Sequence, residues 1–500
     1  MSNIDNGRIT PHLHELLSLF PYDFARPAQL AALEVIARMF REDIHYSMIE
    51  APTGTGKSAL AIAVARYAAT LADGGYEPGA YILTPYNNLA EQMTADFADL
   101  GLTALRGRLH YGAQPPGAYA RARDEFVESP MGVTSYAYYL RACHLPERQV
   151  LILDEAHTLE RVLLDMAGFT ITPSAFQALG IVTSPPIGMP DQGRDVEWLG
   201  AEVLPALRKH ASSRRDPVAR MAWEDLAERV AEYTDIADRS QWIAWAEKGA
   251  FNAKPLSVSM QASDLFERAR FVLIQSATIF DFRTFRRILG IREDALAFSA
   301  PSDFPLCNRP ILYRPAGSMA AAAMDQTIPN LCTEVERIVG DFSQSKGVVH
   351  THSYTINRRV AMHLAAKYGD RIITHGQNAR DREQAILRHR TSEGATVLVS
   401  PSLTEGVDLK DDLARFQIVC KVPYPRLDTY TRTRCARDRG WYELQTAWAL
   451  VQMIGRAVRS EADSATTFVL DSQFEKFVSR NEGILPRWWR AAIQKTEKAA

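Results

Sequence analysis

A glycine-rich turn near the N-terminus holds the residues best suited to phosphate chemistry. Residues 50–58 read Glu-Ala-Pro-Thr-Gly-Thr-Gly-Lys-Ser, between an apolar run at 46–49 and an alanine-rich run at 59–69. A strand, a turn and a helix in this order present backbone N–H groups and a helix N-terminus to anionic oxygens. We therefore expect Lys57 to neutralise the β- and γ-phosphates of a nucleotide and Ser58 to hold magnesium. The other residues expected to line this phosphate loop are Thr53, Gly54, Thr55 and Gly56.

One position departs from the strict pattern of such loops. The usual first glycine is Ala51 here. A flexible turn rich in glycine and threonine is the alternative interpretation of the same residues. A second nucleotide-binding element further along the chain would decide between the two.

An acidic pair supplies that second element. The apolar run at 150–153 predicts a buried parallel strand that ends in Asp154, Glu155, Ala156 and His157. After a phosphate loop, an acid at the end of such a strand completes the magnesium site, which is the role we expect for Asp154. Glu155 suits the general base that orients the attacking water. Acidic strand ends are often only solvated, but the pairing with the loop predicts hydrolysis of a nucleoside triphosphate.

A third element lies about four hundred residues beyond the loop. Gln452, Arg456 and Arg459 are separated by four and three residues, so they could share one face of a helix. The arginine fork is planar and always charged, which suits a transition-state phosphate. An ordinary amphipathic helix with surface arginines is the alternative.

Together these elements resemble the motifs of superfamily 2 helicases, specifically the XPD/DinG branch. Further stretches resemble the other motifs of that branch in the same order. These stretches are 26–29 (adenine-site motif), 83–92 (motif Ia), 275–278 (motif III), 348–354 (motif IV), 404–408 (motif V) and the Pro-Tyr-Pro at 423–425. The resemblance covers roughly residues 20 to 480, and only the motifs match closely.

The resemblance implies roles for several more residues. Arg26 and Gln29 would bind the adenine base. Gly406 and Asp408 of motif V would lie at the nucleotide, where Asp408 and Glu405 transmit domain closure rather than perform chemistry. ATP and magnesium are the implied cofactors.

The chain departs from the branch where a four-cysteine iron–sulfur domain usually stands. Residues 105–113 resemble the segment that leads to the first ligand, but Ala113 occupies the ligand position. The interval up to residue 131 contains no cysteine, and only Cys143 lies nearby. A cluster needs about four thiolates, so we predict no iron–sulfur cluster. The remnant at 105–130, with Arg121 as one of its basic residues, could form a strand-separating wedge or a plain surface loop.

Composition sets limits on the class of protein. The chain has 500 residues, a net charge of −2 and 46% hydrophobic residues, which suggests about three domains with sizeable cores. No apolar run reaches the length of a membrane span, and the N-terminus lacks a secretory signal. Five cysteines without a C-x-x-C pair suggest reduced thiols and a cytoplasmic location. The near-zero net charge does not by itself indicate nucleic-acid binding, but arginines gather at 283–287 and 432–439 in a manner that suits phosphate contacts.

The predicted fold class is α/β, with two tandem RecA-like parallel-sheet domains and a helical arch-like insertion in the first. Expected strands lie at 46–50, 80–84, 131–134, 149–154 and 271–275 in the first domain, and at 346–351, 371–374, 395–400, 415–421 and 467–471 in the second. The predicted boundaries are 1–160 with 266–300 for the first domain, 161–265 for the insertion, 301–485 for the second domain and 486–500 for a tail. The tryptophans of the insertion fit a core better than a base-stacking surface.

These features predict a two-domain motor that acts on single-stranded DNA and duplex forks. By resemblance, it would move 5′ to 3′ and unwind duplex DNA, without contact with a membrane. The alternatives are an RNA helicase or remodeler, a translocase without autonomous unwinding, and an accessory motor of a type IV CRISPR ribonucleoprotein, a phage or plasmid system, or a replication or repair complex. A non-catalytic clamp is disfavoured because every expected catalytic position is intact. His350 and His352 have the spacing of a metal pair, but no further ligand accompanies them.

Overall fold

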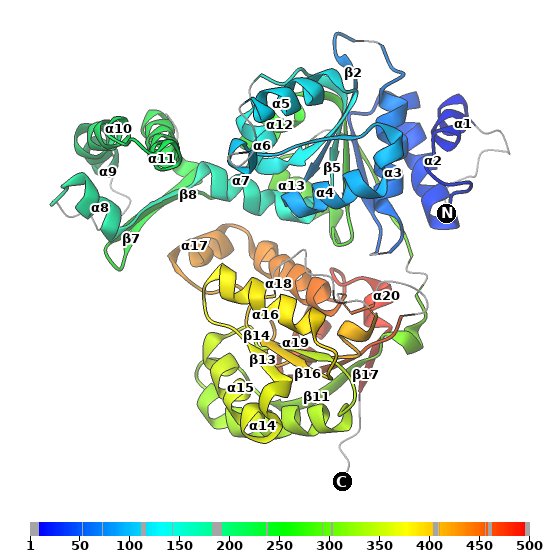
Figure 1. Ribbon diagram of the computed structural model, residues 1–500, viewed down its shortest axis with the longest axis vertical. Helices are drawn as coiled ribbons and strands as arrows, with labels where there is room; N and C mark the ends of the chain where they lie inside the picture. The colour runs from blue at the N-terminus through cyan, green and yellow to red at the C-terminus, as the bar shows by residue number, and fades with distance from the viewer. Residues whose placement is uncertain are drawn as a thin grey trace.

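The computed structural model describes residues 10–52, 54–72, 74–111, 117–142, 144–182, 193–236, 239–292, 294–301, 304–403, 409, 411–455, 457–458 and 463–495. These residues form two α/β domains, one above the other in Figure 1, and an insertion that extends sideways from the first. Each domain has a seven-stranded sheet. The predicted α/β class with two parallel-sheet domains is therefore confirmed.

The first sheet has the strand order β10-β1-β9-β5-β2-β4-β3, and its paired strands are parallel. Its strands are β1 (Tyr46–Glu50), β2 (Glu77–Thr84), β3 (Thr103–Leu105), β4 (Met131–Ser135), β5 (Arg148–Leu153), β9 (Ala269–Ser276) and β10 (Ala295–Ser299). The sequence predicts five of these strands and misses β3 and β10. Because β1, β9 and β5 are neighbours, the segments that follow their carboxyl ends meet at one edge of the sheet.

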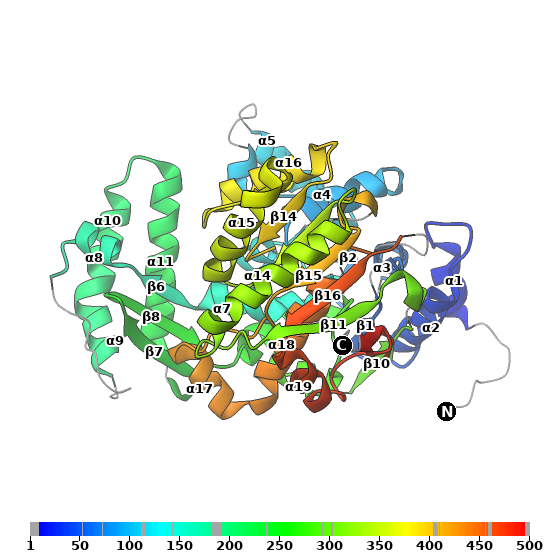
Figure 2. The same ribbon diagram turned by 90° about the horizontal axis from the view of Figure 1, so that it is seen from below.

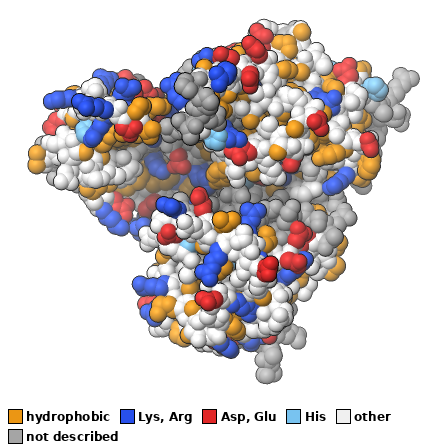
Figure 3. Space-filling model, in the orientation of Figure 1, with side chains coloured by type: hydrophobic (Ala, Val, Ile, Leu, Met, Phe, Trp, Pro, Cys, Tyr) orange, Lys and Arg blue, Asp and Glu red, His pale blue; other side chains and the backbone are white. Residues whose placement is uncertain are grey.

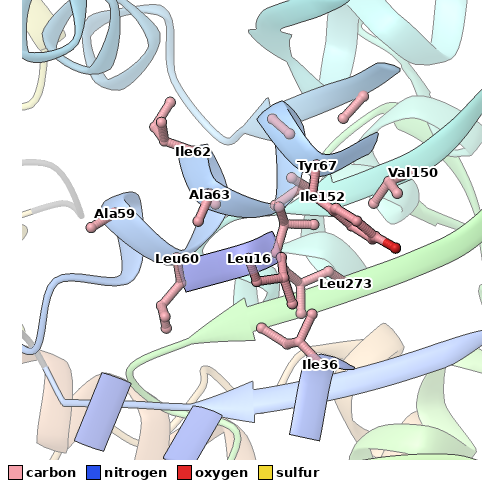
Figure 4. Packing of buried hydrophobic residues seen from close by; sticks show 14 of the residues in the cluster. Leu16, Ile36, Ala59, Leu60, Ile62, Ala63, Tyr67, Val150, Ile152 and Leu273 are labelled. Carbon is pink, nitrogen blue, oxygen red and sulfur yellow. The ribbon is translucent and has the colours of Figure 1, made fainter. Parts of the chain in front are cut away.

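Helices cover both faces of this sheet. One face carries α1 (Pro11–Ser18), α2 (Pro27–Arg41), α3 (Lys57–Ala68) and α4 (Asn87–Asp96), and the other carries α5 (Ala118–Glu128), α6 (Tyr136–Arg141), α7 (Leu159–Ala167), α12 (Ser259–Phe266) and α13 (Phe282–Leu289). The helix after the phosphate loop, α3, is buried all round except at Ser58 and Arg66. Its many alanines let it lie close to the sheet, where Leu60 and Ala63 gather with Ile152 and Leu273 (Figure 4).

The insertion differs from the helical unit that the sequence predicts. It contains a three-stranded antiparallel sheet, in the order β6-β8-β7, beside its helices. Its elements are β6 (Phe169–Ile171), α8 (Pro173–Leu179), α9 (Arg194–Trp198), α10 (Leu204–Ser212), α11 (Pro217–Asp235), β7 (Trp242–Glu247) and β8 (Ala250–Pro255). Strands β7 and β8 form a hairpin because Lys248 and Gly249, with φ of 53° and 78°, make the two-residue turn that hairpins favour.

The insertion has a core of its own, but it is narrower than 161–265. The rings of Trp198 and Phe251 lie 5.7 Å apart in this core, which fits the core interpretation for Trp198, while Trp223 and Trp242 are partly buried against it. Helices α7 and α12 at its two ends belong to the first domain instead, because Leu163 and Leu265 are buried in the core of that domain.

The second sheet has the strand order β13-β14-β12-β15-β16-β11-β17, and its pairs are parallel. Its strands are β11 (Ile311–Gly317), β12 (Gly347–His350), β13 (Ile372–Thr374), β14 (Val397–Ser400), β15 (Phe416–Val419), β16 (Thr466–Asp471) and β17 (Ile493–Lys495). Its helices are α14 (Met324–Asp341), α15 (Tyr354–Tyr368), α16 (Ala379–Thr391), α17 (Thr429–Arg437), α18 (Arg439–Ile454), α19 (Gln473–Arg480) and α20 (Arg487–Arg490).

The C-terminal segment is part of this second domain and not a separate tail. Strand β17 pairs with β11, with Ile493 opposite Ile311. Trp489 is among the largest fully buried side chains. Burial of this indole in the domain core explains why the segment docks onto the sheet. None of the helices in the described part of the chain has the length and apolar character needed to cross a membrane.

Candidate nucleotide site between the two domains

The phosphate loop has the backbone shape that a phosphate cradle requires. Gly54 and Gly56 adopt positive φ angles of 83° and 86°, which glycine tolerates and other residues rarely do. A Cβ atom at Gly56 would overlap Nε2 of Gln29, so the end of that side chain would have to move. Nζ of Lys57 donates a hydrogen bond of 3.0 Å to the carbonyl of Ala51 and is folded back over the loop. The lysine is only 8% exposed, so its charge is held in the loop and not in bulk solvent.

The two residues expected at the adenine base contact this loop directly. Gln29 donates from Nε2 to the carbonyl of Gly56 at 3.4 Å, and its Oε1 accepts from the backbone N–H of Arg26 at 2.8 Å. The Arg26 guanidinium donates to the carbonyl of Gly54 at 3.1 Å. The hydroxyl of Thr55 donates to the carbonyl of Pro52, which closes the turn. Thr53, the remaining loop residue, lies outside the described residues.

The acidic pair lies at the end of β5, beside this loop. Asp154 is buried and its Oδ1 accepts a hydrogen bond of 3.0 Å from Nε2 of Gln275. Burial, and then the neighbouring carboxylate of Glu155, raises the pKa of Asp154 to about 6, while the charge of Lys57 opposes this rise. A carboxylate in this setting is stabilised by a cation. The carboxylate of Asp154 and the hydroxyl of Ser58 are oxygen donors of the kind that magnesium prefers, so they fit the proposed metal site.

A series of polar contacts runs from the acidic pair to the second domain. Glu155 has a left-handed backbone, with φ of 49°, and its Oε2 lies 3.4 Å from Nδ1 of His157. The same nitrogen lies 2.8 Å from Oγ of Ser276. Oγ of Ser276 accepts from the N–H of Thr278 at 3.2 Å, and Oγ1 of Thr278 accepts from Nε2 of Gln452 at 2.8 Å. This relay connects the expected catalytic base with a residue of the other domain.

Only part of the third element lies in the described residues. Gln452 lies on α18, which ends at Ile454, and the described residues Ala457 and Val458 beyond it are not helical. Helix formation stops there because Gly455 is a weak helix former and Ala457 turns into a buried apolar cluster. Besides Thr53, four predicted site residues lie outside the described residues, and they are Arg456, Arg459, Gly406 and Asp408.

One buried acid at the site is missed by the sequence analysis. The Glu50 carboxylate, at the end of β1, accepts hydrogen bonds from the N–H groups of Ile279 and Phe280 and from the hydroxyl of Ser299 at 2.8 Å. Burial raises the pKa of Glu50, and these hydrogen bonds oppose the rise. Glu50 thus holds the segment after β9 against the start of the phosphate loop. Its place at the end of an apolar strand is the signal that could have revealed it.

A second missed acid lies at the contact between the domains. Glu160, on α7, accepts from the guanidinium of Arg434 at 2.9 Å, from Nε1 of Trp441 at 2.9 and 3.0 Å, and from Nε2 of Gln445 at 2.8 Å. Arg434 also donates to the carbonyl of Leu256. The grouping of arginines at 432–439 fits phosphate contacts by sequence, but Arg434 is buried against the first domain and is not available to nucleic acid.

The remnant at 105–130 folds as part of the first domain. Its helix α5 packs through Phe126, whose ring stacks on Tyr81 at 5.4 Å. The hydroxyls of Tyr119 and Tyr138 lie 2.9 Å apart. Ala113 and Cys143 lie outside the described residues, and the absence of an iron–sulfur cluster stays a prediction. Among the residues that are described, no group of three or more His, Cys, Asp or Glu side chains could hold a metal.

His350 and His352 serve the fold in the described structure. Nε2 of His350 lies 3.2 Å from Oε1 of Gln417, on the neighbouring strand β15. Burial lowers the pKa of His352, and the nearby Lys421 adds to this effect. The structure therefore gives no support to the metal interpretation of this pair.

Comparison with known families places the two domains. Residues 26–168 match the model of the DEAD/DEAH box helicase family, and residues 339–492 match the helicase C-terminal domain. The regulator of telomere elongation helicase 1 homolog of Caenorhabditis elegans is 24% identical over 142 residues, which are 23% of this chain and 14% of that protein. The Fanconi anemia group J protein homolog of Gallus gallus is 28% identical over 108 residues, which are 19% of this chain and 9% of that protein. The matches thus span only a small part of these relatives.

Solved structures resemble the chain over nearly its whole length. The superposition on an XPD helicase structure spans 95% of this chain and 100% of the XPD chain, with a TM-score of 0.67 and 14% sequence identity. The Xpd4 structure of S. tokodaii covers 94% of this chain and is itself covered over 100%, with a TM-score of 0.66 at 15% identity. At this level of identity the likeness concerns the fold, which is that of tandem RecA-like domains.

Proposed function

We propose that this chain, which belongs to the XPD/DinG-like helicases of superfamily 2, is an ATP-dependent DNA helicase that moves 5′ to 3′ along single-stranded DNA and separates duplexes. The observation that carries the proposal is the relay from Glu155 to Gln452. It connects the expected base for hydrolysis with the other domain through a 3.4 Å contact between Glu155 and His157 and through the hydrogen bonds that lead from His157 to Gln452. Such a connection makes hydrolysis and domain movement depend on each other.

The residues of the first domain supply the binding and orientation that hydrolysis of ATP requires. Lys57 and the N–H groups of the phosphate loop would bind the β- and γ-phosphates, while Gln29 and Arg26 would hold the adenine base. Glu155 would orient the attacking water and accept its proton. Magnesium, held by Ser58 and Asp154, would neutralise charge on the phosphates. Arg456 and Arg459 are proposed to complete the site from the second domain. Gly406 and Asp408 are proposed to lie at the nucleotide, where Asp408 and Glu405 transmit closure.

Nucleic acid would bind across both domains, at the starts of helices α4 and α15. Asn87 and Asn88 are exposed at the start of α4, and Tyr354 is exposed at the start of α15. Helix starts of this kind bind backbone phosphates well. The space-filling view shows the molecule hollowed between the insertion and the two domains, with Lys and Arg side chains along the hollow (Figure 3). The choice of DNA and of 5′ to 3′ movement rests on the resemblance to the XPD/DinG branch.

Strand displacement tests the proposal. Matched DNA duplexes with a 5′ or a 3′ overhang are incubated with the full chain and ATP, and release of the labelled strand is followed. We expect release only from the 5′ overhang, and no release by Lys57→Ala, which should still bind the overhang. Release from the 3′ overhang alone would refute the proposed polarity, and ATP hydrolysis by Lys57→Ala would refute the site assignment.

The same assay separates the remaining alternatives. Unwinding of an RNA duplex but not of a matched DNA duplex would indicate an RNA helicase. DNA-stimulated hydrolysis without strand release would indicate a translocase, or an accessory motor that needs a partner such as a CRISPR ribonucleoprotein or a plasmid-encoded complex.

A further inference from the structure

A pocket lined by four arginines lies on the first domain, apart from the nucleotide site. It encloses about 800 Å³. Arg283, Arg286 and Arg287 belong to α13, and Arg292 follows that helix. Met48 of β1 lines the pocket from the sheet side. The arginines at 283–287 that the sequence analysis singles out are thus gathered in one concave surface, and the proposed function gives them no role.

The charge of this pocket is only partly compensated. The described residues that line it include no aspartate or glutamate. Arg287 forms an ion pair of 2.6 Å with Asp438 of the second domain. Arg283 and Arg292 are exposed and form no ion pair with any residue in the described part of the chain. Uncompensated guanidinium groups in a concave surface attract and hold anions.

The N-terminus of α12 opens into the same pocket. Ser257 and Ser259 line the pocket, and α12 begins at Ser259. Its N-cap residue is Val258, whose side chain cannot accept a hydrogen bond, so only the N–H of Ser259 finds a nearby acceptor, Oγ of Ser257 at 3.3 Å. The exposed start of a helix carries partial positive charge that adds to the charge of the arginines.

The pocket lies where three parts of the molecule meet. Helix α13 covers the face of the first sheet opposite to α4, the helix expected to touch nucleic acid. Gln241, just before β7, lines the pocket from the base of the insertion. Asp438 of the second domain forms the ion pair with Arg287. In Figure 2, β10 and α17 lie low in the view, whereas α4 lies near its top.

We propose that this pocket binds backbone phosphates of single-stranded nucleic acid, as a second contact separate from the α4 side. Arginine forks bind phosphate oxygens in pairs, and the partly exposed ring of Phe282 at the pocket could stack on a base. The exposed Arg283 and Arg292, on a pocket of about 800 Å³, suit successive phosphates of a strand better than a single small anion. The inference rests on the proposed function only in assuming that the chain binds single strands.

Salt dependence of binding tests this proposal. The affinity of nucleotide-free full chain for a fluorescent single-stranded DNA is measured at several salt concentrations, for wild type and for Arg283→Glu with Arg292→Glu. Each phosphate contact on a single strand adds about 0.7 to the slope of log K against log salt, so loss of two contacts should lower the slope by about 1.4. We expect affinity to fall about tenfold at low salt, while hydrolysis of ATP without DNA stays at the wild-type rate.

A matched control changes the charge by the same amount elsewhere. Arg41→Glu with Lys476→Glu reverses two exposed charges on α2 and α19, and it should keep the wild-type slope. An unchanged slope in the pocket variant would overturn the proposal, and so would an equal loss in the control. Loss of tripolyphosphate binding with unchanged DNA binding would also overturn it, because the pocket would then serve a small anion. If the charge reversals lower the melting temperature, the two arginines are changed to glutamine and the slopes are compared again.

Discussion

Replacing Arg434 with methionine should expose the energetic role of the contact between α7 and the second domain. The guanidinium and the Glu160 carboxylate are both nearly buried, with side-chain exposures of 8% and 4%. Removing one partner of such a pair leaves a buried charge and typically costs about 3–5 kcal/mol. Trp441 and Gln445 still donate to the carboxylate in the variant, so we expect a cost of about 3 kcal/mol, at the lower end of that range.

A double substitution separates the cost of the unpaired Glu160 charge from the cost of the other contact that Arg434 loses. Burial already raises the pKa of Glu160, and Arg434 is the first of the groups that oppose this rise. Glu160→Gln in the Arg434→Met background removes the unpaired charge, so it should recover about 2 kcal/mol. About 1 kcal/mol stays lost, because the hydrogen bond of Arg434 to the Leu256 carbonyl is gone as well.

Urea unfolding of the wild type, both single variants and the double variant provides the measurement. A coupling free energy of about 1.5 kcal/mol or more between the two positions is the expected result. Additivity of the single variants to within about 0.5 kcal/mol would refute the reasoning. A conservative Arg434→Lys variant serves as the control, since it keeps the charge but loses the fork geometry, and it should fall between the wild type and Arg434→Met.

Three further predictions concern single positions. Burial lowers the pKa of His389 to about 4 from an ordinary 6.5, so the free energy of unfolding should be highest above about pH 6.5 and fall by roughly 3 kcal/mol as the pH drops toward 4. Urea midpoints measured against pH should show this fall, and a His389→Gln variant with the same pH dependence would contradict it. In a fluorescent-nucleotide titration, Gly56→Ala should weaken nucleotide binding about tenfold or more, because its Cβ would displace Gln29 and its φ is positive. Gly483→Ala, whose Cβ would meet open space, is the control. Thr278→Val removes the acceptor for the hydrogen bond that Gln452 donates from the second domain. This should lower DNA-stimulated hydrolysis about five- to tenfold without a change in nucleotide affinity, and stimulation at the wild-type level would show that the relay is not needed.

The strands that carry the nucleotide site could be predicted because they are buried on both faces. Such strands appear as short continuous apolar runs, and β1, β5 and β9 all follow this pattern. The missed strands lie at or near sheet edges or carry polar residues. Strand β11, with Arg314 and Pro315 in its second half, shows no such run. The hairpin of the insertion is missed for a similar reason, since all residues of β7 are only half-buried.

The limits of the site prediction have a different cause. Residue types and spacing identify groups that contact a nucleotide, because that chemistry fixes them locally. They do not reveal whether a charged side chain faces a ligand or another part of the chain. Arg434 faces Glu160 across the domain contact, and Glu50 faces backbone N–H groups more than two hundred residues away along the chain. Both contacts depend on the tertiary structure, within one domain for Glu50 and between the two domains for Arg434.

The place of β1 within its sheet has a consequence for synthesis of the protein on the ribosome. Both neighbours of β1 come from much later in the chain, with Ser276 and Ser299 opposite Glu50. The strand before the phosphate loop therefore stays without its partners until the whole insertion and β10 have emerged. Pairing over such sequence distances is slow, and an unpaired apolar strand is prone to aggregation. The nascent chain should thus gain nucleotide affinity only after about three-fifths of its 500 residues have been made, and until then Tyr46–Ile49 is a segment that chaperones would need to protect.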